Sequence, residues 1–285
     1  MTSTEDKSAA VAANAGPKPH GELMENGKTI VYALLIALVL RVILFQPFTI
    51  PSASMEPTLY EGDYIIVSKF AYGWSKHSLP ISLPIFKGRI FERAPQRGDI
   101  VVFKWPHDDK TDYIKRLIGL PGDRIQVKGG QLFINGQAVQ RKNVGTGVAT
   151  CPGSNDLEPG VPRYQETFPG GKSIVTDSCT GATGIADNTD VFVIPDHCFF
   201  MMGDNRDNSS DSRFDAYLPP NAAANACPGF NGKDGGGPGV GFVPAENLVG
   251  KADIILLSWH KGASLFLPWT WFTKARPSRF FHVLQ

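Results

Sequence analysis

The chain has 285 residues, 42% of them hydrophobic, which suffices for one large domain or two small ones with a substantial core. Its formal net charge is +1, from 28 basic and 27 acidic residues, so it lacks the broad positive surface of a nucleic-acid-binding protein, and no nucleic-acid partner is expected. Thirty glycines and 22 prolines separate short runs rich in Val, Ile and Phe, a composition typical of a mainly β protein.

The first long apolar run, TIVYALLIALVLRVILFQPF, covers residues 29–48. About 20 apolar residues in a helix span roughly the 30 Å core of a bilayer, so the run predicts one transmembrane helix, with Arg41 reaching toward the headgroups. A cleaved secretory signal is the alternative, because SAS at residues 52–54 resembles a small-x-small cleavage site. The long, weakly basic preceding segment favours an uncleaved anchor.

The segment before this run, residues 1–28, is predicted to be a disordered cytoplasmic tail. Its first 20 residues are rich in Ala, Ser and Lys and show no apolar period. Lysines precede the run, whereas no Lys or Arg follows it until Lys69, and basic residues mark the cytoplasmic side of a span. The rest of the chain is therefore expected on the outer side.

Strand-like runs follow the apolar segment. They lie at residues 63–70, 98–105 and 112–120, with Pro and Gly between them. Next, Gly129-Gly130 and Asn135-Gly136 are two-residue turn signals between short β runs, which predict a β-meander.

The spacing of apolar runs predicts the domain organisation. A β core is expected at residues 49–139 and 191–285. Between its two parts, residues 140–190 are rich in Gly, Thr, Ser and Pro, so they are interpreted as an inserted smaller lobe of strands and loops. A Gly-, Asn- and Pro-rich stretch at 215–241 is interpreted as a loop insertion.

The four cysteines contain no Cys-x-x-Cys pair, so no metal site is expected, and three disulfide connectivities are open among Cys151, Cys179, Cys198 and Cys227. A disulfide suits a domain outside the cytoplasm, and Cys151 with Cys179 is the expected bridge. Cys198 lies in the apolar run CFFMMG and is expected to be a buried free thiol.

The stretch IPSASMEPTL, residues 50–59, carries Ser52 and Ser54 between two prolines. In an extended segment, side chains two positions apart point the same way, so both hydroxyls would face one groove. Such a pair suits a nucleophile with a neighbouring donor that helps to hold an oxyanion. A plain polar linker after the apolar run is the alternative.

A nucleophilic serine needs a base. None of the six histidines lies in a recognisable triad context, and Gly-x-Ser-x-Gly is absent from the sequence. In DYIKRLIGLPGD, Lys115 would share a strand face with Tyr113 and Leu117, while Arg116 points to the opposite face, so one cation can be buried and the other exposed. Burial lowers the pKa of a lysine, and the neutral amine can take a serine proton. The alternative is a solvated charge at a sheet edge.

The stretch GDNRDNSSDSR, residues 203–213, is dense in polar side chains. A calcium-binding EF-hand is rejected because no reading frame places Gly sixth and Glu twelfth. Asp211 and Arg213 are candidates for a structural ion pair, and a serine of this stretch is a candidate for orienting the lysine amine by hydrogen bonding.

Together these stretches resemble the type I signal peptidases, membrane-bound serine proteases that remove signal peptides from exported proteins. The resemblance lies in PSASMEPTL, RGDIVVFKWP, DYIKRLIGLPGD and GDNRDNSSDSR, followed by GFVPAENLVGKA. It covers residues 40–139 and 191–258. Ala53 stands where many members have Gly, and one span precedes the serines where some members have two.

The resemblance implies roles for individual residues. Ser54 would be the nucleophile, Lys115 the general base, and Ser52 an oxyanion donor. The supporting residues would orient the amine or shape the nearby backbone: Ser209, Asp211, Arg213, Gly203 and Asp204. The residues matching shallow substrate pockets for a small-x-small motif are Phe48, Ile50, Leu59, Tyr113 and Ile114.

The implied partners are signal-peptide-bearing pre-proteins and a lipid bilayer, with no cofactor and no metal. The implied location is the bacterial inner membrane, with one span, the catalytic domain on the periplasmic face and a monomeric state. Two alternatives are another Ser-Lys protease and an inactive, membrane-tethered β binding module. Among the former, a self-cleaving repressor would need a DNA-binding domain for which the tail has no pattern, whereas a maturation peptidase stays open.

Overall fold

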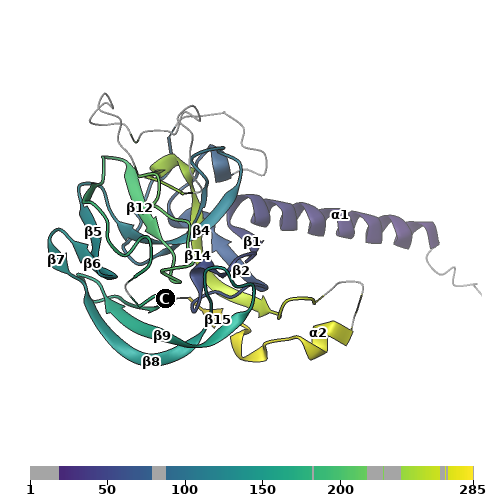
Figure 1. The fold of residues 1–285 in the computed structure, drawn as a ribbon. Coiled ribbons are helices and arrows are strands. Elements are labelled where there is room, and N and C mark those ends of the chain that lie inside the picture. The colour runs from purple at the N-terminus through teal and green to yellow at the C-terminus, as the bar shows by residue number, and fades with distance from the viewer. Residues whose placement is uncertain are drawn as a thin grey trace, which may run out of the picture. The chain divides into compact units, whose positions relative to one another are not determined.

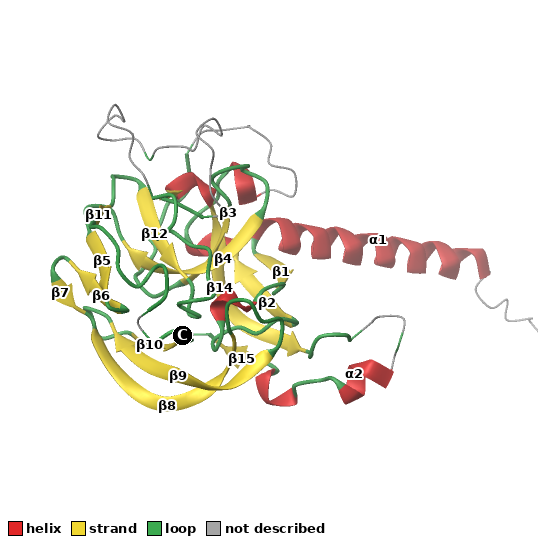
Figure 2. Cartoon of the chain, viewed as in Figure 1, coloured by secondary structure: helices red, strands yellow, loops and turns green. Residues whose placement is uncertain are grey.

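The computed structural model describes residues 19–78, 88–181, 183–216, 227, 239–263, 267 and 269–284 (Figure 1). The chain divides into two compact units, Met1–Arg41 and Val42–Gln285. The second unit is mainly β, as the sequence predicts, and holds three antiparallel sheets (Figure 2).

The first unit is dominated by helix α1 (Pro19–Ile43). Its apolar side chains are exposed, including Ile30 at 60%, Leu34 at 64% and Leu38 at 54%. Among the residues that the structure describes, no helix reaches the length and apolarity required to cross a membrane. The predicted disorder is wrong for residues 19–28, which are helical, and the prediction for residues 1–18 lies outside the described residues.

The end of the predicted apolar helix also differs. The helix stops at Ile43, and residues 45–48 of the predicted span belong to strand β1 (Phe45–Thr49). Pro47 lacks the N–H that a helix interior requires, and β1 satisfies its backbone instead by pairing with β2 (Asp63–Ser68).

The largest sheet carries the site. In spatial order it contains β1, β2, β14 (Leu248–Ser258), β3 (Ile100–Lys104), β4 (Asp112–Gly119), β12 (Cys198–Met202) and β13 (Val243–Pro244), and β15 (His282–Val283) pairs with β14. The strands predicted at 63–70, 98–105 and 112–120 are thus confirmed as β2, β3 and β4. Apolar side chains pack on both faces of this sheet, which explains why β3 and β4 are buried on both sides.

The predicted meander is confirmed as β5 (Arg124–Lys128), β6 (Gln131–Ile134) and β7 (Gln137–Ala138), joined by β11 (Phe192–Val193). At the second turn, Asn135 and Gly136 have φ values of +53° and +80°, the left-handed conformation that Asn-Gly adopts readily.

The predicted inserted lobe, residues 140–190, contains a three-stranded sheet. Its strands are β8 (Gln140–Thr150), β9 (Leu157–Thr167) and β10 (Ser173–Asp177) (Figure 2). Two of these strands have 11 residues each, which is longer than the few apolar residues in this part of the sequence would predict. Phe168 and Ile174 share a core cluster with Ile118 of β4, so this sheet packs within the same compact unit as the site.

The remaining helical elements are short. The helix α2 comprises Trp269–Thr273, and single 3₁₀ turns lie at Ala53–Met55, Lys69–Ala71, Lys76–Ser78, Ala245–Asn247 and Pro277–Arg279.

Two disulfides are present. Cys151 pairs with Cys179, as expected, with a Cα–Cα distance of 5.7 Å. The prediction of a free thiol at Cys198 is wrong, because Cys198 is bonded to Cys227. Cys198 is fully buried in β12, so an apolar setting alone did not distinguish a thiol from half of a bridge. Most of the predicted loop insertion at 215–241 lies outside the described residues.

Candidate active site

Ser54 lies in a tight turn that packs against β4 of the largest sheet. The expectation of a wholly extended segment is wrong, because Ala53–Met55 form a 3₁₀ turn that follows an extended Ser52 with φ −142° and ψ 156°. The Met55 side chain is fully buried, and the Glu56 N–H donates to the Ala53 carbonyl, so the turn is fixed by packing and by its own backbone. The two serine Oγ atoms still lie 3.4 Å apart, with Ser54 buried and Ser52 exposed.

Lys115, from β4, reaches this turn. Its Nζ is hydrogen-bonded to Ser54 Oγ at 2.7 Å and to the Ile114 carbonyl oxygen at 3.1 Å. Only 4% of the Lys115 surface is exposed. Burial lowers the pKa of the Lys115 amine to about 8, although the carboxylates of Asp211 and Asp204 oppose the shift. About one such amine in ten is then neutral at pH 7, compared with about one in 2,500 for an ordinary lysine.

The neighbouring cation is buried as well. Arg116 is 1% exposed, so the expectation that one of the two cations stays exposed is wrong. Its guanidinium forms a bidentate pair with Asp204, from Nε to Oδ1 at 2.7 Å and from Nη2 to Oδ2 at 2.6 Å. Nη1 also donates to the Gly98 carbonyl oxygen at 2.7 Å. Sequence reasoning missed Arg116 because it took one face of β4 to be open to solvent.

The predicted ion pair between Asp211 and Arg213 is formed. Arg213 Nε and Nη2 each lie 2.9 Å from an oxygen of the Asp211 carboxylate. The Asp211 Oδ2 atom also accepts the Gly203 N–H at 3.0 Å. Burial alone would raise the pKa of Asp211, but Arg213, together with the hydrogen bond from the Gly203 N–H and the nearby Ser209 hydroxyl, holds that pKa below the ordinary value. Asp211 is therefore a fixed negative charge that favours the protonated form of Lys115.

Ser209 lies close to this pair. Its hydroxyl is buried against Gly203. Within the described part of the chain, no hydrogen bond joins Ser209 Oγ to Lys115 Nζ. The role of Ser209 in orienting the lysine amine therefore stays a prediction.

A cavity of about 520 Å³ opens beside the Ser54 hydroxyl. One wall is the start of β4, with Tyr113 and Ile114 as predicted, and Thr150, Ser154 and Asn155 form the wall at the end of β8.

The other three predicted pocket residues are not among the described residues that line this cavity: Phe48, Ile50 and Leu59. Ile50 and Leu59 belong instead to the core behind the Ser54 turn, and Phe48 packs against that core. The resemblance implied these positions, and a match of apolar residues does not by itself distinguish a pocket wall from the core that supports it.

Asn205 joins the two sides of the site, and sequence reasoning missed it. Its side-chain amide donates to the Thr150 carbonyl oxygen at 2.8 Å and to that of Ala53 at 3.3 Å. Its backbone N–H donates to the Ser54 carbonyl oxygen at 3.2 Å. Its position in the polar stretch 203–213 indicated that Asn205 could lie near the site, but the hydrogen-bond partners of its amide cannot be predicted from sequence.

Comparison with known proteins gives a consistent result. The family model for "Signal peptidase, peptidase S26" matches residues 23–259. The signal peptidase I of Rickettsia massiliae (strain Mtu5) is 39% identical over 237 residues, which cover 80% of this chain and 77% of the relative. That of Rickettsia felis is 39% identical over 236 residues, with the same coverage.

A crystal structure of a signal peptidase I from Enterococcus faecalis V583 is also similar, with 23% sequence identity and a TM-score of 0.28, and the match covers 56% of this chain and 97% of that one. Because the family model matches most of the chain, the resemblance seen in the sequence motifs is confirmed. The chain therefore belongs to the signal peptidase family, peptidase S26, and is a serine endopeptidase that removes signal peptides.

Proposed function

We propose that Ser54 is the nucleophile and Lys115 the general base of this peptidase. The neutral Lys115 amine takes the proton of Ser54 Oγ as that oxygen bonds to the carbonyl carbon of the scissile peptide bond. The resulting ammonium then gives its proton to the leaving nitrogen, which breaks the C–N bond and leaves an acyl ester on Ser54. Water then loses a proton to the amine as its oxygen bonds to the ester carbonyl carbon. The bond from that carbon to Ser54 Oγ breaks as the ammonium returns the proton to Oγ, which releases the acid product and restores the serine. The contact of 2.7 Å between the two atoms is the observation that carries this proposal.

Ser52 supports the nucleophile in this scheme. Its hydroxyl lies 3.4 Å from Ser54 Oγ, close to where the carbonyl oxygen becomes negatively charged. A hydroxyl donor aimed at that oxygen stabilises the transition state more than the ground state.

The substrate is an extended peptide cleaved after a small-x-small motif. Among the described strands, β12 pairs with β4 only at Arg116, Leu117 and Gly119, so residues 112–115 have a strand partner, β3, on one side alone. An extended peptide can add to such an edge through its main chain. Tyr113 and Ile114 narrow the cavity there, which excludes large side chains sterically.

The reaction takes place at the outer face of a bacterial inner membrane, on signal-peptide-bearing pre-proteins, with the enzyme acting as a monomer. Two features support a bilayer. The apolar side chains of α1 are exposed. Near the C-terminus, Trp269, Trp271 and Phe272 are 62%, 41% and 84% exposed, and aromatic residues of this kind favour the membrane interface. In this arrangement the exposed apolar side chains of α1 hold the chain at the bilayer.

The test is a cleavage assay with the full chain in detergent and a pre-protein that carries an Ala-x-Ala motif. Ser54→Ala and Lys115→Ala are each expected to lower kcat/KM by at least about 10³-fold, because nucleophile and base act as a unit. Ser173→Ala and Lys128→Ala, at exposed positions outside the site, serve as matched controls. Undiminished cleavage by either site variant would exclude this dyad, and a wild-type chain without activity would favour the tethered binding module.

A further inference from the structure

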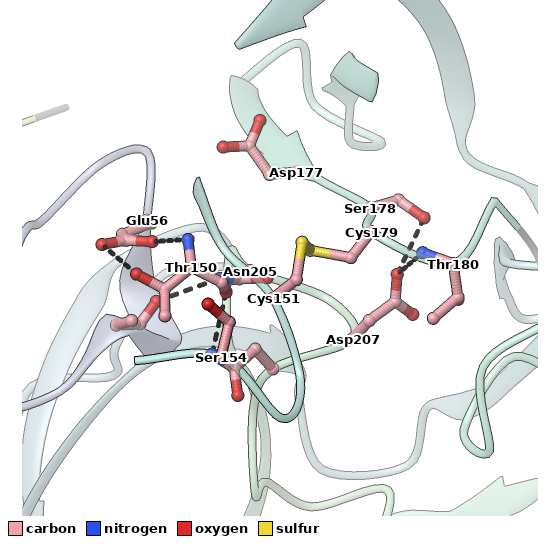
Figure 3. Close-up of a disulfide and its surroundings, with 12 residues drawn as sticks. Glu56, Thr150, Cys151, Ser154, Asp177, Ser178, Cys179, Thr180, Asn205 and Asp207 are labelled. Carbon is pink, nitrogen blue, oxygen red and sulfur yellow. Dashed lines mark hydrogen bonds between the residues drawn. A yellow bond between two sulfur atoms is a disulfide. The ribbon is translucent and has the colours of Figure 1, made fainter. Parts of the chain in front are cut away.

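The wall of the cavity opposite β4 begins at Thr150, the last residue of β8. Glu56, two residues after Ser54, reaches this wall. Its Oε2 accepts the Thr150 backbone N–H at 2.7 Å, and its Oε1 accepts the Thr150 hydroxyl at 3.4 Å. Both carboxylate oxygens are therefore directed at one residue of the wall (Figure 3).

Glu56 is an unusual residue to find here. Only 2% of its surface is exposed, and within the described residues no Lys or Arg forms an ion pair with it. Burial raises the pKa of its carboxyl group, and the bonds from Thr150 oppose the shift only in part. Burying an acid without a cation costs free energy, and hydrogen bonds to the carboxylate offset part of that cost. The only side-chain hydrogen bonds that the structure gives it are those from Thr150.

A second contact, made by the next residue of the chain, also holds this wall in place. Cys151 is bonded to Cys179, and on either side of Cys179 the Ser178 hydroxyl and the Thr180 N–H donate to Asp207 Oδ2, at 3.0 and 2.9 Å. Figure 3 shows the disulfide lying between the Glu56–Thr150 contact and the Asp207 contact. The disulfide thus ties the wall to the polar stretch 203–213.

The wall is separate from the chemistry of the dyad. The Glu56 carboxylate contacts Thr150 and not Lys115, and the backbone bond from Glu56 N–H to the Ala53 carbonyl that closes the Ser54 turn does not depend on the side chain. Loss of the carboxylate therefore leaves the 2.7 Å contact between Lys115 and Ser54 in place while it removes the bonds to the Thr150 N–H and hydroxyl. The Thr150 carbonyl oxygen still accepts the side-chain amides of Asn205 and Asn208, each at 2.8 Å, so the wall is loosened on one side and not detached.

We propose that Glu56 and the Cys151–Cys179 disulfide are positioning residues for substrate: they hold Thr150 and residues 151–155 at the distance from β4 that an extended peptide requires. The inference rests on the proposed function, because it takes this cavity to be the peptide-binding cleft. According to this proposal, the Glu56 contact and the disulfide affect the binding of the peptide and not the proton transfer between Ser54 and Lys115.

The experiment measures kcat and KM for pre-protein cleavage by the full chain in detergent. Glu56→Ala and the double variant Cys151→Ala/Cys179→Ala are each expected to raise KM about tenfold, which corresponds to about 1.4 kcal/mol, with kcat changed less than about threefold. Glu56→Gln keeps an oxygen that can accept the Thr150 N–H, so it is expected to restore KM most of the way to the wild-type value. The pH dependence of kcat is expected to stay unchanged in all three variants.

The second disulfide provides the matched control. Cys198→Ala/Cys227→Ala removes a bridge of similar sequence separation, 29 residues against 28, that lies outside the described cavity lining. It is expected to lower Tm without raising KM, which separates a local effect on the wall from general loosening of the fold. If Glu56→Ala does not fold, Asp207→Ala, which removes the acceptor of the Ser178 and Thr180 bonds, tests the far end of the same wall and is expected to raise KM by a smaller factor.

Two outcomes would overturn the inference: an unchanged KM in the Glu56 and Cys151/Cys179 variants, or a fall in kcat with a shifted pH profile. Its failure is distinct from failure of the dyad. If Ser54→Ala and Lys115→Ala lose cleavage while the wall variants bind substrate normally, only the positioning role is wrong.

Discussion

Arg116 and Asp204 form a two-point ion pair that joins β4 directly to the segment after β12, with both side chains at most 2% exposed. Removing one partner from such a pair leaves the other charge buried and unpaired. Asp204→Asn is therefore expected to lower the free energy of unfolding by about 3–5 kcal/mol. Chemical denaturation of the full chain in detergent measures this. Asp112→Asn, which breaks the more exposed pair with Lys104, is the control and should cost under about 1 kcal/mol.

The lowered pKa of Lys115 makes a prediction about pH. The base acts only when neutral, so kcat/KM for pre-protein cleavage should rise tenfold per pH unit below about 8 and level off above that value. The profile should contain no step near pH 6.5, because no histidine takes part in the proposed mechanism. An activity that is already constant from pH 6 upward would contradict the role of Lys115 as the base.

The charges around Lys115 should move this profile in opposite directions. Asp211 favours the ammonium form and Arg213 disfavours it. Asp211→Asn should therefore lower the pKa of Lys115 and shift the midpoint of the profile to lower pH, whereas Arg213→Leu should shift it to higher pH. The comparison of the two midpoints is informative even if both variants lose stability, since general loosening would move both in the same direction.

Gly203 should not tolerate a side chain. A Cβ at this position would collide with the Ser54 carbonyl oxygen and with the Ser209 hydroxyl. The Ser54 oxygen belongs to the backbone of the Ala53–Met55 turn, so relieving the collision would require a backbone shift that costs free energy. Gly203→Ala is expected to lower kcat by about 10²-fold or more by displacing Ser54. The control is Gly27→Ala in α1, because a Cβ at Gly27 would meet no atom within 4 Å and the backbone there does not have a positive φ.

Part of the candidate site was predictable from sequence because its residues lie in strands or beside prolines. Alternation along 112–120 separated Lys115 from Arg116, the resemblance paired Lys115 with Ser54, and a short polar stretch supplied the Asp211–Arg213 pair. What could not be predicted depends on tertiary packing. Whether Arg116 meets solvent depends on how the opposite face of β4 is covered, and whether Ile50 lines a pocket depends on how the turn after it bends.

The errors in the fold have a similar origin. The apolar run was read as one helix to residue 48, but β2 offers residues 45–49 a strand partner from beyond the turn. The partner of Cys198 comes from 29 residues further along, in a stretch without regular periodicity. Local sequence patterns indicate which secondary structure a segment prefers, but they do not indicate which other segments pack or pair with it.

The 3₁₀ turn at Ala53–Met55 also bears on the enzyme's own survival. Residues 52–54 read Ser-Ala-Ser, a small-x-small sequence directly after an apolar run, which is the arrangement that the proposed substrates present. A protease takes its substrate as an extended strand, but Ala53 and Ser54 are coiled and buried. In the folded chain, this small-x-small sequence therefore lacks the extended, accessible backbone that cleavage as a bound strand would require.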